Sequence, residues 1–323
     1  MKRLVTTFAT TLAWLCLSLA PSAAQDWPQK SIRFIVPFPA GGGTDFVARL
    51  VAKFLQDRLG QTIYVENRGG ANGAIGLQAV KQSMPDGYTL AFTSDTPMTV
   101  NPWLYKELGY QPLSDFIPVA SVVRLPGMLA AHPSVPVNNV AELIALAKRQ
   151  PGGVSYASAG VGNFSHLAME LFSGATGVKL LHVPYKGTGP ASLGLLAGEV
   201  QIGFNNVQTL LQLVQEKKLK ALGVAEPQRM PQLPDLPAVA ETVPGFEMAP
   251  WVGIVAPAGT PQAVVDRLSE ATLKVMGNPA IAKQFSDQQL TVMAIAKERF
   301  GELIKSDTDK WAKVTKAAGI KME

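Results

Sequence analysis

Cysteine, histidine and charged residues are scarce in this sequence. One cysteine, Cys16, and three histidines occur among 323 residues, and charged residues make up 16% of the chain. No spacing of these side chains matches a metal site, and we expect no metal ion or other cofactor. Cys16 lies inside an apolar N-terminal run. The chain after this run has no cysteine and can fold in an oxidising compartment without disulfide errors.

A strong charge of either sign is also absent. The chain has 29 Lys and Arg against 24 Asp and Glu, a formal net charge of +5. Loss of Lys2 and Arg3 with an N-terminal leader leaves 27 basic against 24 acidic residues, a net charge of +3. So small and evenly spread a charge predicts no binding to nucleic acid or to membrane surfaces.

Long hydrophobic runs are absent except at the N-terminus. A basic start precedes an apolar run from about Leu4 to Ala20, and small residues follow at Ser22 and Ala24, where signal peptidase reads them. Threonines interrupt the run, which falls short of the roughly 20 apolar residues that a membrane span needs. The pattern predicts a signal peptide over residues 1–24, cleaved after about Ala24, and export to the periplasm.

Strand and helix patterns alternate after this leader. Ile32–Val36 has the apolar composition of a buried strand, and Gly41–Gly43 ends it. An amphipathic helix follows, with Thr44 or Asp45 as its N-cap and Gly60 as its end. Strands at 63–65 and 89–92, with a helix between them, complete a βαβαβ unit that predicts a parallel sheet.

The alternation restarts near residue 154, about 120 residues after the first glycine loop, which is a domain's worth of chain. The predicted strands of this second unit are 154–157, 178–183, 200–204 and 219–224, and its predicted helices are 165–172, 192–197 and 210–215. We therefore expect two α/β units, each opened by a strand, a glycine loop and a helix.

The remaining chain is too short for a third domain. A proline-rich stretch over 227–250 precedes a strand at 251–256, a helix capped at Thr260 and Pro261, and a last helix ending near Gly319. We expect this tail to pack on the first unit. Domain 1 then comprises residues 25–125 and 248–323, domain 2 comprises 126–247, and two chain crossings form a hinge.

The two strand–glycine loop–helix junctions carry the strongest chemical signal. Glycine lets a backbone approach a ligand closely, and the helix behind it offers unpaired N–H groups and a partial positive charge. Both loops follow the carboxyl ends of strands, where open α/β sheets bind ligands. The pattern indicates an anion site built without a cationic side chain.

Nucleotide-binding interpretations of these glycines fail. Phe46 and Ser165 stand where a dinucleotide fingerprint has its third glycine, and neither loop has the Lys-Ser/Thr pair of a phosphate loop. A nucleophile elbow is the other alternative, because Ser158 follows a strand and His166 lies nearby, but Tyr156 stands where the elbow needs glycine. An exported serine hydrolase using Ser158 and His166 stays open as an alternative, as does the ligand-presenting module of a sensor.

Further polar residues follow the predicted strands. Ser94, Thr96, Asn205, Tyr185 and Lys186 each lie at a strand's carboxyl end, which suits them for binding as well as for turns and caps. Candidates for the apolar walls of a pocket are Phe38, Phe164 and Trp251. His166 falls in the first turn of its helix, where it caps the helix or lines the pocket wall.

At these residues the chain resembles a known family, the periplasmic solute-binding proteins of tripartite tricarboxylate transporters, also called Bug proteins. The resemblance covers the predicted mature chain and rests on motifs at 35–45, 67–76, 85–89, 101–102, 156–160, 182–187 and 256–261. It implies a two-lobed periplasmic-binding-protein fold, type II-like, that closes over a small carboxylate. We expect a monomer that docks transiently on membrane subunits of such a transporter.

The resemblance further implies that backbone amides and ordered water from the two loops hold the carboxylate. The residues carried over are Phe38, Pro39, Ala40, Gly41, Gly42 and Asp45 on the first lobe and Ser158, Ala159, Gly160, Gly162 and Asn163 on the second; with Thr44, Ser94, Thr96, His166, Tyr185, Lys186 and Asn205 they form the predicted ligand-binding set. The resemblance implies one of several small carboxylates, which in the family include tricarboxylates, acidic amino acids and aromatic acids. The loops contain no arginine, which favours a mono- or dicarboxylate with an apolar body.

Overall fold

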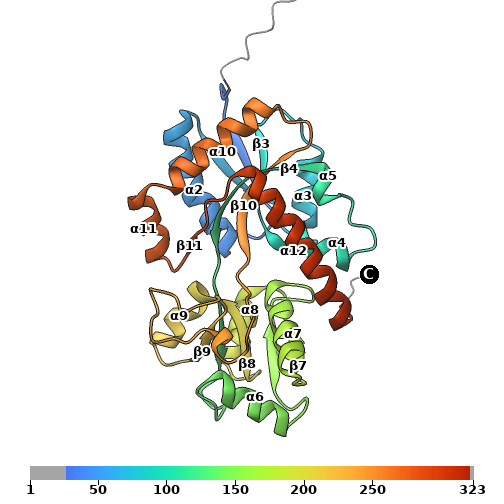
Figure 1. Ribbon diagram of the computed structural model, residues 1–323, viewed down its shortest axis with the longest axis vertical. Coiled ribbons are helices and arrows are strands. Elements are labelled where there is room, and N and C mark those ends of the chain that lie inside the picture. Colours follow the sequence, from blue (N-terminus) through green and yellow to red (C-terminus); the bar gives the residue numbers. More distant parts are fainter. Residues whose placement is uncertain (1–26, 321–323) are drawn as a thin grey trace, which may run out of the picture.

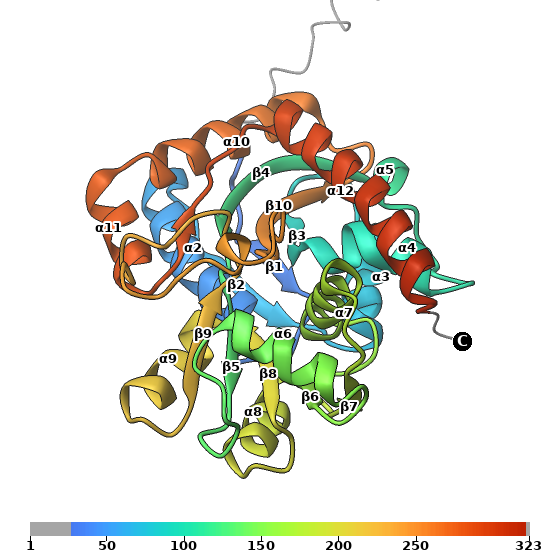
Figure 2. The same cartoon turned by 60° about the horizontal axis from the view of Figure 1, so that its bottom comes forward.

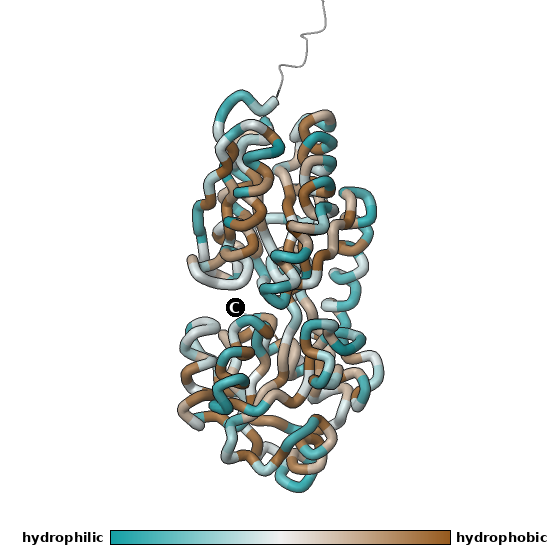
Figure 3. Tube along the Cα trace, turned by 90° about the vertical axis from the view of Figure 1, so that its left-hand side faces the viewer, coloured by the Kyte–Doolittle hydropathy of each residue, from teal (hydrophilic) through white to brown (hydrophobic). Residues whose placement is uncertain are grey.

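The computed structural model describes residues 27–320, so the predicted signal peptide and its cleavage site lie outside the described residues. Two β-sheets with flanking helices form two lobes stacked along the long axis of the molecule (Figures 1 and 3). The predicted two-lobed α/β fold is confirmed. Within residues 27–320, no helix has the length and apolarity that crossing a membrane takes.

The first lobe is built on a six-stranded sheet with the order β11-β4-β10-β3-β1-β2. Its strands are β1 (Ile32–Val36), β2 (Ile63–Asn67), β3 (Thr89–Ser94), β4 (Phe116–Arg124), β10 (Trp251–Pro257) and β11 (Thr291–Val292). β1 pairs in parallel with β2 and β3, as predicted. β10 runs antiparallel to β3 and β4, and the sequence patterns did not indicate β4.

The second lobe is built on a five-stranded sheet with the order β7-β6-β8-β5-β9. Its strands are β5 (Gly127–Ala131), β6 (Ser155–Ser158), β7 (Leu181–Pro184), β8 (Ile202–Asn206) and β9 (Lys220–Val224). β6 pairs in parallel with β7 and β8, so their carboxyl ends share one edge, whereas β5 is antiparallel to β8 and β9.

Two chain crossings join the lobes and lie side by side. The first connects β4 to β5 through Leu125 and Pro126, and the second returns just before β10. The N–H of Leu125 donates to the carbonyl of Pro250 over 2.9 Å, and the Arg124 guanidinium pairs with the Glu247 carboxylate. These contacts tie the crossings together at the predicted hinge.

Helices cover both sheets, and Figure 2 shows their arrangement from a second direction. The first lobe carries α2 (Gly43–Leu59), η2 (Ala71–Gly73), α3 (Ala74–Lys81), η3 (Thr96–Val100), α4 (Asn101–Leu104), α5 (Pro112–Asp115), α10 (Gln262–Met276) and α11 (Pro279–Asp287); the second carries α6 (Val140–Arg149), α7 (Phe164–Thr176), α8 (Thr188–Leu196), α9 (Val207–Gln215) and η4 (Val239–Glu241). α2 begins two or three residues earlier than its polar residues suggest, because the extended Gly42 and not Thr44 or Asp45 is its N-cap.

The last helix, α12 (Lys297–Ala318), contacts both lobes. Phe300 and Ile304 belong to an apolar cluster of the first lobe. Trp311 and Ile320, which lies two residues beyond the end of α12, pack in a cluster with Phe172 of α7, beside which α12 ends in Figure 1. The tail therefore packs on more than the first unit. The predicted domain boundaries stay a prediction.

Candidate functional site

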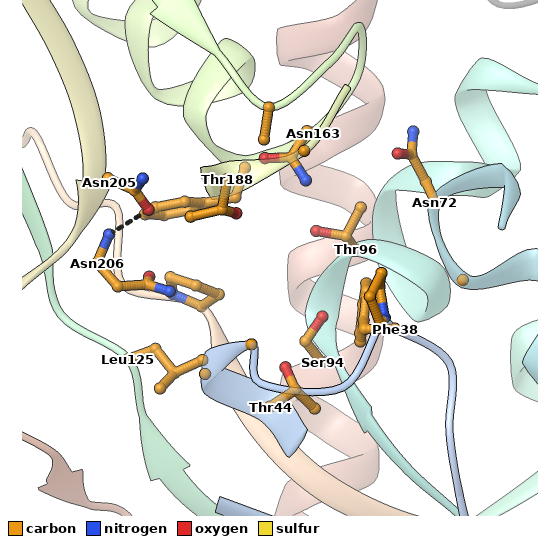
Figure 4. Close-up of a pocket in the computed structure, with 18 of the residues that line it drawn as sticks. Phe38, Thr44, Asn72, Ser94, Thr96, Leu125, Asn163, Thr188, Asn205 and Asn206 are labelled. Atoms are coloured by element: carbon orange, nitrogen blue, oxygen red, sulfur yellow. Dashed lines mark hydrogen bonds between the residues drawn. The ribbon is translucent and has the colours of Figure 1, made fainter. Parts of the chain in front are cut away.

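A cavity of about 610 Å³ lies between the lobes, at the carboxyl ends of β1, β3, β6 and β8 (Figure 4). Its lining is residues 37–44, Gly70, Asn72, Gly73 and 94–96 of the first lobe, Leu125 and Pro250 of the crossings, and Ala159, Asn163, Phe164, 186–190, Asn205, Asn206 and Thr209 of the second lobe. Both glycine loops reach the same cavity from opposite lobes. Sequence alone placed them at strand ends, and the fold brings them face to face.

The first glycine loop, residues 38–42, joins β1 to α2 and is held by a charged network. The Asp45 carboxylate accepts from the Gly41 N–H over 2.9 Å, from Arg49 Nε over 3.1 Å and from Asn67 Nδ2 over 2.9 Å. Asn67 Nδ2 also donates to the Phe38 carbonyl over 3.1 Å. Gly41 has a φ of 80°, a conformation that favours glycine. The network holds the loop and the start of α2 in place beside the cavity.

Asp45 itself does not line the cavity, although it was predicted to bind the ligand. Its side chain is buried beneath the loop, and all its contacts are with protein groups of the first lobe. Burial raises the pKa of Asp45, but the hydrogen bonds with Arg49, Gly41 and Asn67 outweigh burial and hold the pKa below its ordinary value. Asp45 is therefore an ionised group that positions the loop.

The second glycine loop, residues 159–163, joins β6 to α7 and is held by neutral groups. Asn163 caps α7, and its Oδ1 accepts from the Ser165 N–H over 3.2 Å. The Ser165 hydroxyl accepts from the Ala159 N–H over 2.8 Å, and His166 Nδ1 accepts from the Gly162 N–H over 3.0 Å. Of the predicted residues here, Ala159 and Asn163 line the cavity. Gly160, Gly162, Ser158 and His166 are not part of the lining.

Two stacked histidines lie beneath this loop. The ring centroids of His166 and His182 are 4.0 Å apart with planes tilted by 7°, and the Tyr156 ring stacks 4.9 Å from His182 and 6.4 Å from His166. His182 Nε2 is 2.6 Å from the hydroxyl oxygen of Ser158. Burial lowers the pKa of both histidines to about 4, so both are neutral near pH 7.

The pairing of Ser158 with His166, on which the hydrolase alternative depends, is therefore not the one formed. The partner of Ser158 is His182, while His166 Nδ1 is engaged by the backbone of the loop. Ser158 is fully buried and outside the cavity lining, so its hydroxyl is not presented to a substrate. A nucleophile needs a base within reach and access to the reacting atom. This geometry supports the loop and not catalysis.

Neutral amides and hydroxyls line much of the remaining cavity. Asn205 and Asn206 at the end of β8 lie on one side and Asn72 on the other, with Thr96, Ser94 and Thr188 between them (Figure 4). Asn205 Nδ2 donates to Ser192 Oγ over 3.0 Å, and Asn205 Oδ1 accepts from the Asn206 N–H over 2.8 Å. The cavity thus offers many hydrogen-bonding groups with little formal charge.

Lys186 and Asp95 are the ionisable side chains among the described residues that line the cavity. Lys186, which was predicted to bind the ligand, is exposed and lines the cavity. Tyr185, also predicted, does not line it, because its hydroxyl donates to Glu199 Oε2 over 2.8 Å. Asp95 lines this cavity and also a second one of about 230 Å³ near the hinge. Burial, and then the carboxylate of Asp307, raises the pKa of Asp95 to about 7.

The cavity gathers most of the predicted set, and sequence reasoning missed several members. Predicted residues in the lining are Phe38, Pro39, Ala40, Gly41, Gly42, Thr44, Ser94, Thr96, Ala159, Asn163, Lys186 and Asn205. Residues that sequence analysis did not name include Asn72, Leu125 and Thr188. Asn72 follows β2, so the strand-end rule would have found it, whereas Leu125 lies in a crossing with no local signal. Ligand binding by any of these residues stays a prediction.

Sequence comparison places the chain among known receptors. Residues 47–320 match the family model described as the tripartite tricarboxylate transporter family receptor. The chain is 35% identical over 306 residues to the protein BugT of Bordetella pertussis, covering 94% of each chain. It is also 35% identical over 310 residues to a UPF0065 protein from the tcbD–tcbE intergenic region of a Pseudomonas species, covering 94% of this chain and 92% of that one.

Solved structures agree with this result. The periplasmic binding protein BugD is 37% identical, with a TM-score of 0.82 over 92% of this chain and all of BugD. R. palustris Rpa4515 with adipate is 33% identical, with a TM-score of 0.86 over the same shares. MatC from Rhodopseudomonas palustris with bound malate is 30% identical, with a TM-score of 0.80 over 89% of this chain and 99% of MatC. The chain therefore belongs to the tripartite tricarboxylate transporter receptor family, whose members are periplasmic solute-binding proteins and not enzymes.

Proposed function

We propose that this protein captures a small carboxylated solute between its lobes and delivers it to the membrane subunits of a tripartite tricarboxylate-type transporter. The observation that carries the proposal is the pair of glycine loops facing one cavity, each at the N-terminus of a helix, α2 or α7. Backbone N–H groups at helix N-termini bind anions without a cationic side chain. A carboxylate held by both loops would bridge the lobes.

The lining supports a solute with few charges. Lys186 is the cation among the described residues that line the cavity, and Asn and Thr side chains supply most other polar groups. Phe38, Phe164 and Leu125 add apolar walls. A volume of about 610 Å³ suits a small organic acid. These features favour a mono- or dicarboxylate with an apolar body, and two of the solved relatives hold adipate and malate.

Capture would proceed by closure of the hinge. The open form exposes both loops to solvent, and the closed form alone lets one solute contact both, so binding shifts the population toward closure. The crossings at Leu125 and Pro250 line the cavity, which supports a hinge next to the solute. We further propose that the chain works as a monomer in the periplasm after cleavage near Ala24.

The test is native mass spectrometry of the purified protein followed by thermal shifts with adipate, malate, citrate, benzoate and glutamate. A solute at 100 times its Kd should stabilise the protein by about 2.7 kcal/mol. If none of these carboxylates, nor any acid found by mass spectrometry, raises the Tm, the proposal fails. Delivery is tested by uptake of the bound acid in cells with and without the gene.

A matched pair of glycines tests the role of the loops. Gly41 has a φ of 80° and lines the cavity, whereas Gly152 has a φ of 76° in a turn outside the cavity lining; a Cβ at either position meets nothing within 4 Å. Gly41→Ala and Gly152→Ala therefore introduce similar backbone strain. We expect Gly41→Ala to weaken solute binding at least tenfold and Gly152→Ala to leave it unchanged. Equal affinities in both variants would remove the first loop from the site.

A further inference from the structure

A segment of the first lobe, Gly69–Gly76, lies wedged against the first glycine loop. A Cβ at Gly69 would be 3.2 Å from Pro39 Cδ, and one at Gly76 would be 2.7 Å from Pro37 Cα. Gly70, Asn72 and Gly73 of this segment also line the cavity. The segment, which includes η2, is therefore in direct contact with the loop that is proposed to hold the solute.

The backbone of this segment is strained at two consecutive residues. Ala71 has a φ of 48°, and Asn72 has a φ of 49° and a ψ of 37°, both in the left-handed region. Asparagine tolerates this conformation better than alanine does, and such strain concentrates at ligand clamps and switch regions. The buried Asn101 amide donates to the Asn72 carbonyl over 3.1 Å and holds the strained residue in place.

The side chain of Asn72 reaches the opposite lobe. Its Nδ2 donates to the carbonyl oxygen of Val161 over 3.2 Å, and Val161 lies in the second glycine loop. Figure 4 shows Asn72 on the side of the cavity opposite Asn205 and Asn206. One amide thus connects the segment packed on the first loop to the backbone of the second loop.

Other hydrogen bonds between the lobes lie away from both loops. Gln208 Nε2 of α9 donates to the Gln288 carbonyl over 2.7 Å, and Gln232 Nε2 donates to Ser286 Oγ over 2.7 Å. Both of these bonds end at or just after α11. Among the inter-lobe hydrogen bonds found in residues 27–320, the Asn72 bond is the one that ends on a glycine loop.

We propose that Asn72 is a positioning residue that latches the two glycine loops together in the closed form and slows escape of the solute. This inference rests on the proposed function, because it assumes a cleft that closes over a carboxylate. The bond needs Val161 within reach of Asn72, so it forms when the lobes close and breaks when they separate. The strained backbone, held by Asn101, keeps the Asn72 amide directed across the cleft. Closure therefore loses little conformational entropy at this residue.

The test measures closure in the absence of solute. The chain after residue 24 has no cysteine, so Lys53→Cys on α2 and Gln215→Cys on α9 place one spin label on an exposed face of each lobe. Pulsed electron spin resonance then gives the inter-lobe distance distribution. Asn72→Gly removes the amide while keeping left-handed backbone accessible. Ala71→Gly is the matched control, because it relieves similar strain next door and leaves the latch intact.

We expect Asn72→Gly to raise the ratio of open to closed forms about twofold to tenfold, the usual worth of one hydrogen bond, and Ala71→Gly to leave it unchanged. Asn72→Asp, which tolerates the same backbone but lacks the donor, should match Asn72→Gly. In all three variants the off-rate of a bound acid such as adipate should follow the open fraction. A parent-like distance distribution in Asn72→Gly, with and without the acid, would overturn the latch.

The two ways of failing are distinguishable. If no carboxylate binds the parent protein, the proposed function fails, while the distance distributions of the unliganded proteins still decide whether Asn72 holds the lobes together. If carboxylates bind but Ala71→Gly opens the cleft as much as Asn72→Gly does, the effect belongs to backbone flexibility. The latch is then wrong and the proposed function stands.

Discussion

The two glycine loops face the same cavity, but different chemistry holds each of them. The first loop is fixed by an ionised network in which Asp45 accepts from the loop backbone, Arg49 and Asn67. The second is fixed by uncharged groups, among them Ser165 and the stacked pair below it. Similar local geometry at two strand ends therefore does not require similar supporting residues.

This difference predicts different sensitivities. An ionised carboxylate with a lowered pKa keeps its hydrogen bonds throughout the neutral range, and its ion pair responds to salt. Two neutral histidines with a pKa of about 4 respond to acid and hardly to salt. The first lobe also contains Asp95, whose pKa is raised. Lowering the pH should therefore increase the contribution of Asp95 in the first lobe to stability and decrease the contribution of the histidine pair in the second lobe.

Replacing Asp95 should have the largest effect on stability. Its pKa rises from the ordinary 3.8 to about 7 on folding, so the folded state binds the proton more tightly and stability falls as pH rises from about 4 to 7. Asp95→Asn removes this penalty. We expect the variant to be more stable than the parent by up to about 4 kcal/mol at pH 8 and to gain far less at pH 4.5, measured by urea unfolding.

The outcome that contradicts this prediction is an equal change in the free energy of unfolding at both pH values. Such a result would mean that Asp95 stays ionised in the folded protein. It would also mean that acid does not stabilise the first lobe while it destabilises the second. Asp57→Asn, at an exposed carboxyl on α2, serves as the control and should change stability little at either pH.

Acid should next weaken the support of the second loop. The pKa of His166 and His182 falls from 6.5 to about 4 on folding, so the unfolded chain binds more protons between these values. Stability contributed by the pair is complete above about pH 6.5 and is lost as pH falls toward 4. In the Asp95→Asn background we expect a loss of about 3 kcal/mol between pH 6.5 and 4, after discounting for partial exposure.

Replacing one histidine separates this effect from general acid denaturation. His182→Gln removes one titrating ring and keeps an acceptor for Ser158, so the acid loss should shrink by about half. His132→Gln is the control, since His132 lies outside the loop and bonds Ser134 in the turn after β5. A pH profile of His182→Gln that parallels the parent would show that the stacked pair does not carry the acid sensitivity.

Removing Asp45 should weaken solute binding about 10- to 100-fold. The loss leaves the Gly41 N–H, Arg49 and Asn67 without their shared acceptor, and an unmade hydrogen bond of this kind costs about 1–3 kcal/mol. Isothermal titration of Asp45→Ala with the bound acid measures the change. Asp45→Asn keeps an acceptor and should recover part of the affinity. An Asp45→Ala variant with parent affinity would show that the loop holds its shape unaided.

Features that depend on neighbouring residues could be predicted from the sequence, and features that depend on distant residues could not. The apolar run of β1, the glycines and the αL caps at Gly60 and Gly319 are local, and the structure confirms them. The antiparallel pairing of β4 with β10 joins segments about 130 residues apart, so no short pattern indicates it. The two glycine loops could be predicted because each directly follows a strand in the sequence, which is also a local pattern.

The roles of single side chains were harder to predict. Asp45 was expected to contact the solute, yet Asn67, which belongs to β2, draws its carboxylate under the loop. The hydrolase alternative paired Ser158 with His166 because they are close in sequence, whereas His182 of the neighbouring strand β7 is the partner of Ser158. In each case the deciding group lies on another strand. The sequence patterns predicted which residues lie at the strand ends. The direction in which each side chain points depends on contacts with other strands, which these patterns do not contain.

Salt should produce the smallest effect and the sharpest contrast between the loops. Arg49 pairs with Asp45 across 3.0 Å, but its side chain is 52% exposed, so the pair contributes about 1 kcal/mol or less. Arg49→Met should lower solute affinity no more than about fivefold, and the loss should shrink in 1 M NaCl, where charges are already screened. Asn163→Ala, its counterpart in the second loop, should lose the same affinity at both salt concentrations because its capping bond involves no formal charge. Parallel salt dependence in the two variants would remove the distinction between a charged and a neutral loop.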